Sequence, residues 1–215
     1  MNKPTLQIER TYMRLLRAYV NALQAAAFRV IAGRLDAREA VDIRVAMHDI
    51  PIPDTKTIAS RVAKGASASF QRLTGITPLG AGSGPLIDHW RAVNVHLIRS
   101  IADDLLPEVT KILNTSEDIR GDLIERFDVT KSRADLIARD QTLKLNGQIT
   151  EHLHTDAGIT RYRWSTSHDD RVRPEHDELD GTEQEWANPP DTGNGQNHPG
   201  QDIQCRCVAI PIIED

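Results

Sequence analysis

Aromatic residues are scarce in this chain of 215 residues, in which Phe, Trp and Tyr together make up 4%. The cysteines are limited to Cys205 and Cys207, which excludes a disulfide framework as the basis of the fold. Apolar runs stay well short of the roughly 18 residues that a membrane-spanning helix needs. The first ten residues lack the apolar segment of a secretory signal. We therefore expect a soluble protein without membrane partners, made in a reducing cytoplasm.

Charge is unevenly distributed along the chain, whose formal net charge is −5. Residues 160–215 carry five basic and twelve acidic residues, a net charge of −7, which leaves +2 for residues 1–159. A polyanion would be attracted to the first part and repelled by the second. Arg10, Arg14 and Arg17 form a basic stripe beside the apolar positions. They are candidates for contact with a partner subunit or DNA, and a solvated helix face is the alternative interpretation.

Apolar residues recur every three or four positions over the first thirty residues, which predicts a long helix that ends at Gly33. A second helix is expected from Asp36, a capping residue, to Ile50, because Pro51 then interrupts the helical pattern. A third helix is expected over residues 54–73. The N-terminal part of the chain is therefore predicted to be entirely helical.

A glycine-rich segment, residues 76–85, follows and predicts a flexible linker. It lacks the Lys-Ser/Thr pair of a phosphate-binding loop, so a nucleotide site of that type is excluded. A helix is then expected over residues 86–114, bent or broken at Pro107. We predict two more helices: a short one that ends near Phe127, and one over residues 130–155 that Thr130 and Ser132 open.

Alternation of side chains over residues 161–166 predicts a strand, and residues 203–210 are expected to form a second one. Between them, residues 187–201 are rich in Pro, Gly and Asn and predict a long loop. We therefore predict a mainly α fold, with an extended helical N-terminal and central region followed by a small, loop-rich α+β C-terminal module. The predicted parts are residues 1–75, the linker 76–85, residues 86–158 and residues 159–215.

Both cysteines and several histidines lie in the predicted C-terminal module. On an extended strand, Cys205 and Cys207 would point to the same face because they are two positions apart. With His168 and His176 they would complete a closed, tetrahedral, structural zinc site, for which His198 is a substitute ligand. Such a site would hold together a loop-rich segment that has few aliphatic residues. The alternative is that the cysteines are small buried hydrophobic residues and the histidines are hydrogen-bonded.

Four charged residues, Asp170, Arg171, Arg173 and Asp180, lie around the turn between His168 and His176. We expect the arginines to pair with Asp170 or Asp180 and fix this turn. In a nuclease, carboxylates and histidines of this segment would instead bind Mg²⁺. The sequence shows no nucleophile–base pair, so a structural role is favoured over catalysis.

The segment from Trp164 to Gly181, WSTSHDDRVRPEHDELDG, is followed by the motifs His198-Pro-Gly200 and Cys205-Arg-Cys207. This combination resembles the C-terminal signature of the phage head morphogenesis (Mu F-like) minor head proteins. The helical segment before it agrees with the same family at three short motifs, at residues 94–98, 131–134 and 137–141. The resemblance covers residues 86–213, whereas residues 1–75 match only as a generic helical start.

The resemblance implies a non-enzymatic minor capsid protein of a tailed phage or prophage, located in the virion at the portal vertex and assembled in the host cytoplasm. It implies a role in head assembly and in genome packaging and ejection. The implied partners are the portal protein, other head and connector proteins, and double-stranded DNA. Two alternatives stay open: a metal-dependent nuclease that acts on phage DNA through His168, Asp170, His176 and Asp180, and a nonspecific DNA-binding protein.

Overall fold

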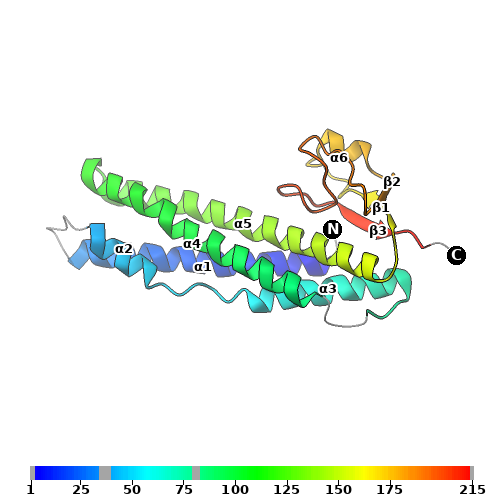
Figure 1. The fold of residues 1–215 in the computed structure, drawn as a ribbon. Helices are drawn as coiled ribbons and strands as arrows, with labels where there is room; N and C mark the ends of the chain where they lie inside the picture. Colours follow the sequence, from blue (N-terminus) through cyan, green and yellow to red (C-terminus); the bar gives the residue numbers. More distant parts are fainter. Residues whose placement is uncertain (1–2, 34–39, 79–82, 214–215) are drawn as a thin grey trace. The chain divides into compact units, whose positions relative to one another are not determined.

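The computed structural model of the chain describes residues 3–33, 40–78 and 83–213 (Figure 1). Within these residues it has six helices and one three-stranded sheet, which confirms the predicted mainly α fold with a small α+β C-terminal module. The helices are α1 (Lys3–Gly33), α2 (Ala40–His48), α3 (Lys56–Thr74), α4 (Gly84–Thr115), α5 (Ile119–Asp156) and α6 (Pro174–Glu178). The strands are β1 (Arg161–Ser165), β2 (Glu183–Glu185) and β3 (Val208–Pro211).

The first three helices agree with the prediction. Helix α1 ends at Gly33, and α3 lies within two residues of its expected bounds. Asp36, the predicted cap of the second helix, and residues 79–82 of the predicted linker lie outside the described residues. None of the described helices is both long and apolar enough to span a lipid bilayer.

The central helices differ from the prediction in two respects. Helix α4 continues through Pro107, so of the two expected outcomes, a bend or a break, the break is wrong. Helix α5 is one continuous helix of 38 residues, not two. The hydroxyl groups of Thr130 and Ser132 donate to the carbonyl oxygens of Arg126 and Asp128, four residues earlier. These hydroxyls therefore bond to the helix they belong to and do not open a new one.

Contacts within the chain group it into two compact units, which we describe separately. The first comprises residues 1–10, 56–91 and 139–215 and contains the sheet; the second comprises residues 11–55 and 92–138. In the second unit the buried Tyr12 hydroxyl donates to Oδ1 of the buried Asn94 over 2.8 Å. The four-part division expected from the sequence stays a prediction.

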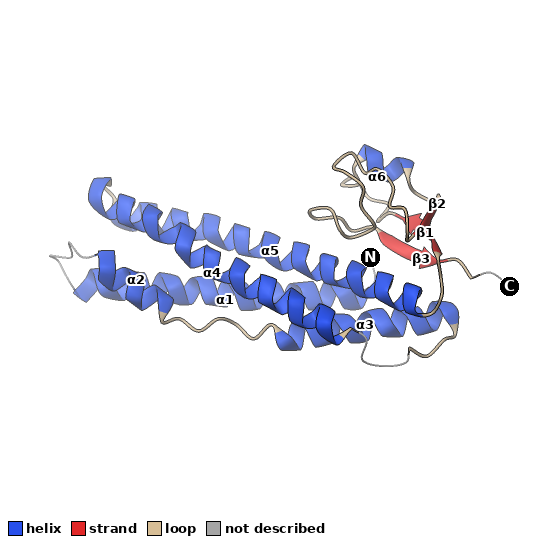
Figure 2. Cartoon of the chain, viewed as in Figure 1, coloured by secondary structure: helices blue, strands red, loops and turns tan. Residues whose placement is uncertain are grey.

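The sheet of the first unit has the order β2-β1-β3, and both pairs are antiparallel (Figure 2). Strand β1 confirms the expected alternation, because Tyr162 and Trp164 are fully buried while Arg163 is exposed. The expected strand over 203–210 is wrong in its first half, since β3 begins only at Val208. Gln204 has a φ of +60°, a turn conformation that an extended strand does not contain. Strand β2 was not expected.

A small core covers one face of this sheet. Its members are Tyr162, Trp164, Trp186, Cys205, Cys207 and Ala209, with Leu179 packed against them. Two of these six buried side chains are cysteines, and the aliphatic contribution is limited to one alanine and the partly buried leucine. A core of this size is small for a segment of more than fifty residues, which makes the contacts around the cysteines important for its order.

Candidate metal centre

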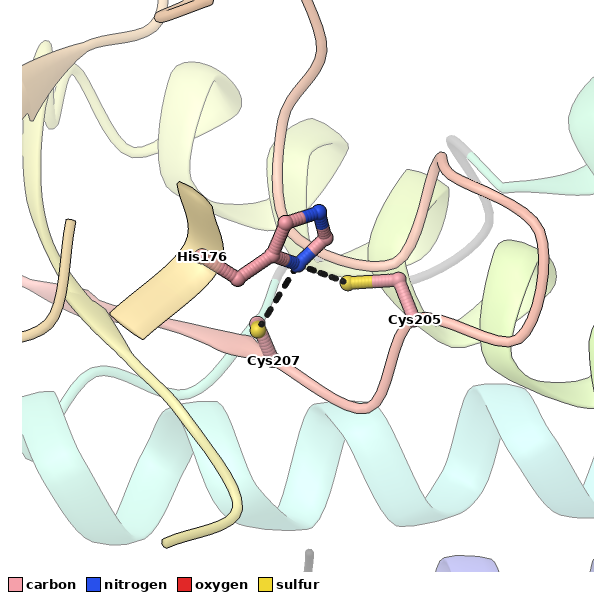
Figure 3. Close-up of side chains that lie close together, drawn as sticks. All are labelled: His176, Cys205 and Cys207. Carbon is pink, nitrogen blue, oxygen red and sulfur yellow. Dashed lines mark hydrogen bonds between the residues drawn. The ribbon is translucent and has the colours of Figure 1, made fainter. Parts of the chain in front are cut away.

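Three buried side chains that are potential metal ligands, His176, Cys205 and Cys207, meet in the C-terminal module (Figure 3). The Nδ1 atom of His176 lies 3.5 Å from the sulfur of each cysteine. The ligand atoms of all three lie within 4.8 Å of one another. We call these three residues the Cys2His cluster. It is compatible with a bound metal ion.

Helix α6 positions the histidine. Pro174 occupies its first turn, where the missing N–H costs no hydrogen bond. His176 is 2% exposed and packs edge-on against Trp164, with ring centroids 5.6 Å apart. Arg173, the residue before the helix, donates from Nη2 to the carbonyl oxygen of Ile203 over 2.7 Å. The helix is thereby tied to the segment that carries the cysteines.

Asp202 fixes the orientation of the imidazole ring. Its Oδ2 atom lies 2.9 Å from Nε2 of His176, and both side chains are buried. Its other oxygen accepts a hydrogen bond from Nδ2 of Asn197 over 3.0 Å. A carboxylate accepts hydrogen bonds, so this contact places a proton on Nε2 and directs Nδ1 of the ring at the two sulfurs. A carboxylate in this position is the usual partner of a metal-binding histidine.

The cysteine segment is held against helix α5 within the first unit. The backbone N–H of Gln204 donates to Oδ1 of Asp140 over 2.9 Å, and Arg139 Nη1 donates to the Gln204 side chain over 3.1 Å. A Cβ at Gly147 would lie 2.6 Å from the carbonyl oxygen of Pro199, so the loop approaches the helix as closely as a glycine allows. The backbone N–H of Gly200 donates to the sulfur of Cys205 over 3.4 Å.

The two thiols of the cluster affect each other's ionisation. Hydrogen bonds from Cys207 and His176 lower the pKa of Cys205 to about 5, against the effect of burial. The pKa of Cys207 is raised, because a second thiolate beside Cys205 is unfavourable and burial adds to the effect. Hydrogen bonding to Cys205 raises the pKa of His176. The cluster concentrates negative charge and electron pairs in a buried space, which a cation would neutralise.

The segment that contains this cluster also identifies the family. Residues 103–210 match the family described as "Phage Mu protein F like protein", which is half of the chain. The chain belongs to the phage Mu protein F like family. Membership points to a protein of phage head morphogenesis.

A protein of Haemophilus influenzae (strain ATCC 51907 / DSM 11121 / KW20 / Rd), described as an uncharacterized protein, is 40% identical over 132 residues. The match covers 58% of this chain and 29% of the relative, so the chain spans less than a third of the length of that protein. No solved structure matches the chain. The functional argument therefore depends on the family and on the geometry of the cluster.

Within the family segment, the structure brings together three of the four predicted metal ligands. His168 is not a member of the Cys2His cluster: its Nδ1 atom lies 3.2 Å from the Thr166 hydroxyl and 3.6 Å from Oδ2 of Asp180. His198, the predicted substitute, lies 2.8 Å from the Tyr162 hydroxyl through Nδ1 and 3.2 Å from the carbonyl oxygen of Trp186 through Nε2.

The charged residues of the turn have other partners than the sequence predicts. Arg173 bonds to a backbone carbonyl, as described above, and Asp180 accepts a hydrogen bond from the backbone N–H of Thr166 over 2.7 Å. Asp170 and Arg171 are exposed. The ion pair that ties this turn down joins Asp169 to Arg206, the residue between the two cysteines. It holds the pKa of Asp169 well below its usual range.

The four residues of the predicted nuclease site do not form one group. His176 belongs to the Cys2His cluster, while His168 and Asp180 lie beside each other and Asp170 is exposed. Among the described residues, no group of carboxylates that could hold a metal ion together lies beside these four residues. The described geometry thus gives no support to a magnesium-dependent nuclease site at these positions.

The basic residues of helix α1 are in different situations. Arg17 forms a bidentate ion pair with Asp135 of α5, and both residues belong to the second unit. Arg14 is exposed, and its Nη2 atom donates to the Thr11 hydroxyl over 3.3 Å. Arg10 is exposed. Arg17 is therefore engaged within the chain, which reduces its capacity to contact DNA.

Sequence reasoning missed Asp202 and Asp169. From the sequence, Asp202 contributes only to the acidic charge of the C-terminal part, and Asp169 is only one of the carboxylates that would bind Mg²⁺ in a nuclease. Asp202 lies three residues before Cys205, and a carboxylate so close to a predicted ligand was a signal for a residue that orients the histidine. Asp169 had no comparable signal, because its pairing with Arg206 joins positions 37 residues apart.

Proposed function

We propose that the chain is a minor head protein of a tailed phage or prophage, associated with the portal vertex and acting in head assembly and in genome packaging and ejection. The observation that carries this proposal is the family match over residues 103–210, which includes the end of α4, all of α5 and the whole Cys2His cluster. Portal protein, other head and connector proteins, and the virion as location follow from the same proposal.

A structural role for the C-terminal module agrees with the burial of its cluster. The exposed fractions of His176, Cys205 and Cys207 are 2%, 3% and 8%. A reactive cysteine is normally partly exposed, whereas buried cysteines usually serve structure. We therefore propose a protein without enzymatic activity, in which a zinc ion is the expected cofactor and stabilises the module.

Docking on the portal protein would use exposed apolar side chains of the helices. Val129 and Leu136 lie on α5 within the second unit, and their exposed fractions are 53% and 52%. Seven residues correspond to about two helical turns, so the two side chains share one face of the helix. This face is the surface that we propose for portal contact. Arg10 and Arg14 are the candidates for an additional contact with double-stranded DNA.

Binding to purified cognate portal protein tests the proposal. The chain should bind portal protein, and the double variant Val129→Ser, Leu136→Ser should bind at least about tenfold more weakly, a loss of roughly 1.4 kcal/mol. Both positions are exposed, so the variant should unfold at the same denaturant concentration as the wild type. Val45→Ser, at an exposed position of α2, is the matched control and should bind normally. Equal binding by all three proteins would contradict the proposed surface.

Incubation with duplex DNA tests the absence of enzymatic activity. The protein should leave the DNA intact in the presence of Mg²⁺, Mn²⁺ or Zn²⁺. Cleavage that disappears in His176→Ala would show instead that the chain is a nuclease. If DNA is bound without cleavage, Arg14→Ala should flatten the salt dependence of binding, and Arg17→Ala should change it less because Arg17 is paired with Asp135.

A further inference from the structure

We propose that His176, Cys205 and Cys207 bind one zinc ion, and that Asp202 orients the histidine for it. This ligand set has three side chains of the chain, whereas the sequence suggested four that included His168. The inference goes beyond head assembly, because the site would exist in the isolated protein whatever its partners are.

The distances in the cluster are those of a tetrahedral zinc site. Zinc–sulfur bonds of about 2.3 Å and zinc–nitrogen bonds of about 2.0–2.1 Å, at a tetrahedral angle, place a sulfur and a nitrogen about 3.5 Å apart. The structure places Nδ1 of His176 3.5 Å from each of the two sulfurs. Both nitrogen–sulfur distances thus equal an edge of a zinc tetrahedron, and all three ligand atoms lie within 4.8 Å of one another.

Zinc binding would use one atom of each of the three side chains. The contact of Nε2 with Asp202 leaves Nδ1 of His176 directed at the two sulfurs. An ion among these atoms would be bound by the Nδ1 lone pair and by both sulfurs together. Binding displaces any protons that Nδ1 and the sulfurs still carry, and these go to the solvent.

The surroundings of the cluster match what zinc-bound thiolates and imidazoles need. Asp202 fixes the ring through Nε2, and Gly200 donates a backbone hydrogen bond to the sulfur of Cys205. The indole N–H of Trp164 is buried without an oxygen or nitrogen acceptor, and it belongs to the same small core as Cys207. Two thiolates and an imidazole form a soft donor set, which favours zinc over magnesium or calcium.

The site would join two segments that are distant in the sequence. His176 comes from α6, and the cysteines lie 29 and 31 residues further along the chain. Among the described residues, no fourth histidine, cysteine or carboxylate belongs to the group. The described residues therefore supply three of the four positions that a tetrahedral zinc ion offers.

Metal content of the purified protein is the first test. Protein prepared without chelator should contain one zinc ion per chain, and Cys205→Ser and Cys207→Ser should lose it. Asp202→Asn keeps all three ligands and should weaken zinc binding about 10- to 100-fold, because only the orientation of the ring is affected. His168→Gln is the matched control, because it changes the histidine outside the cluster, and its zinc content should equal that of the wild type.

Two outcomes of these measurements would contradict the zinc site. Wild-type protein that stays metal-free after incubation with zinc would overturn the proposal, as would a loss of zinc in His168→Gln equal to that in Cys205→Ser. If the cysteine variants fail to fold, the wild type loaded with cobalt(II) in place of zinc decides. A thiolate-to-cobalt charge-transfer band with tetrahedral d–d bands supports the assignment, and the absence of the thiolate band overturns it. Portal binding is measured separately, so failure of one proposal does not imply failure of the other.

Discussion

His154 shows how the burial of a single side chain in the first unit sets a pH dependence. It is 1% exposed and lies between the rings of Phe70 and Trp186, with centroid distances of 5.8 Å and 5.4 Å. Burial lowers its pKa from 6.5 to about 4. The unfolded chain therefore binds a proton between these pH values that the folded chain does not bind.

The contribution of His154 to the free energy of unfolding should therefore be fully present above pH 6.5. It should be lost as the pH decreases to 4. The loss can reach about 3 kcal/mol, since each pKa unit corresponds to about 1.4 kcal/mol. His154→Phe keeps an aromatic ring between Phe70 and Trp186 and removes the titration. Urea unfolding at pH 7 and pH 4.5 should show a smaller difference for this variant than for the wild type.

Other groups titrate near the same range, and the comparison with the variant separates them. Burial raises the pKa of Glu151, so this residue stabilises the folded chain as the pH falls. Arg206 lowers the pKa of Asp169, so this residue stabilises the folded chain above the usual pKa of a carboxyl, and the contribution is lost as the pH falls through that value and below it. Both effects are common to wild type and His154→Phe. Identical pH dependence in the two proteins would contradict the assignment to His154.

Also at the scale of single residues, the sequence correctly predicts that Cys205 and Cys207 face the same side. The backbone that brings them there differs from the predicted one. An extended strand was expected to direct Cys205 and Cys207 to one face. The structure instead makes a turn at Gln204, with a φ of +60°, and both sulfurs still face His176. Periodicity cannot show such a turn, because it depends on hydrogen bonds to Asp140 and Arg139 far away in the sequence. The role of Asp202 depends in the same way on a long-range contact.

At the scale of elements, the contact between helix α5 and the loop before the cysteines is limited by two glycines. A Cβ at Gly147 would lie 2.6 Å from the Pro199 carbonyl oxygen, and a Cβ at Gly200 would lie 3.0 Å from that of Leu143. Gly200 also has a φ of +88°, a conformation that side chains disfavour. Backbone atoms on both sides leave little room for adjustment.

Gly147→Ala should therefore destabilise the protein by about 1–3 kcal/mol, as expected for overpacking against a backbone. In an open helical position, the same substitution stabilises by about 0.5–1 kcal/mol. Gly65→Ala on α3 is the matched control, because the nearest atom to its new Cβ would be 4.0 Å away. Chemical denaturation of the two variants should give changes of opposite sign. Stabilisation by Gly147→Ala would show that the loop is not held against the helix.

Helices were the elements that the sequence predicted best. Apolar spacing located α1 because its buried face follows the helical repeat. The break expected within α5 was wrong, because Thr130 and Ser132 are also compatible with a helix interior when their hydroxyls bond back to the preceding turn. Strand β2, with three residues, is too short to give a recognisable alternation.

At the scale of the whole molecule, the two units differ in what stabilises them. The second unit has a helical core that includes Tyr12, Leu16 and Leu23, all fully buried. The C-terminal module has a small core in which two of six members are the cysteines. The module should therefore depend on the proposed zinc ion, whereas the helical core of the second unit should not.

Removal of the metal by a strong chelator should unfold the C-terminal module alone. Amide hydrogen exchange should increase over residues 161–211, while the buried parts of α1 and α4 in the second unit keep their protection. Near-ultraviolet circular dichroism should change as well, because Trp164 and Trp186 belong to the affected core. Addition of zinc should restore both signals. If protection is lost over the whole chain, or nowhere in the chain, the C-terminal module does not depend on the metal separately from the second unit.

Incorporation into phage heads is the decisive property of a minor head protein. The chain should be produced together with the cognate portal and capsid proteins, and the assembled particles should be isolated and quantified by mass spectrometry. The chain should sediment with the particles in a fixed ratio to portal protein, and particles made without portal protein should lack it. Particles of normal composition that never contain the chain would show that it is not a minor head protein.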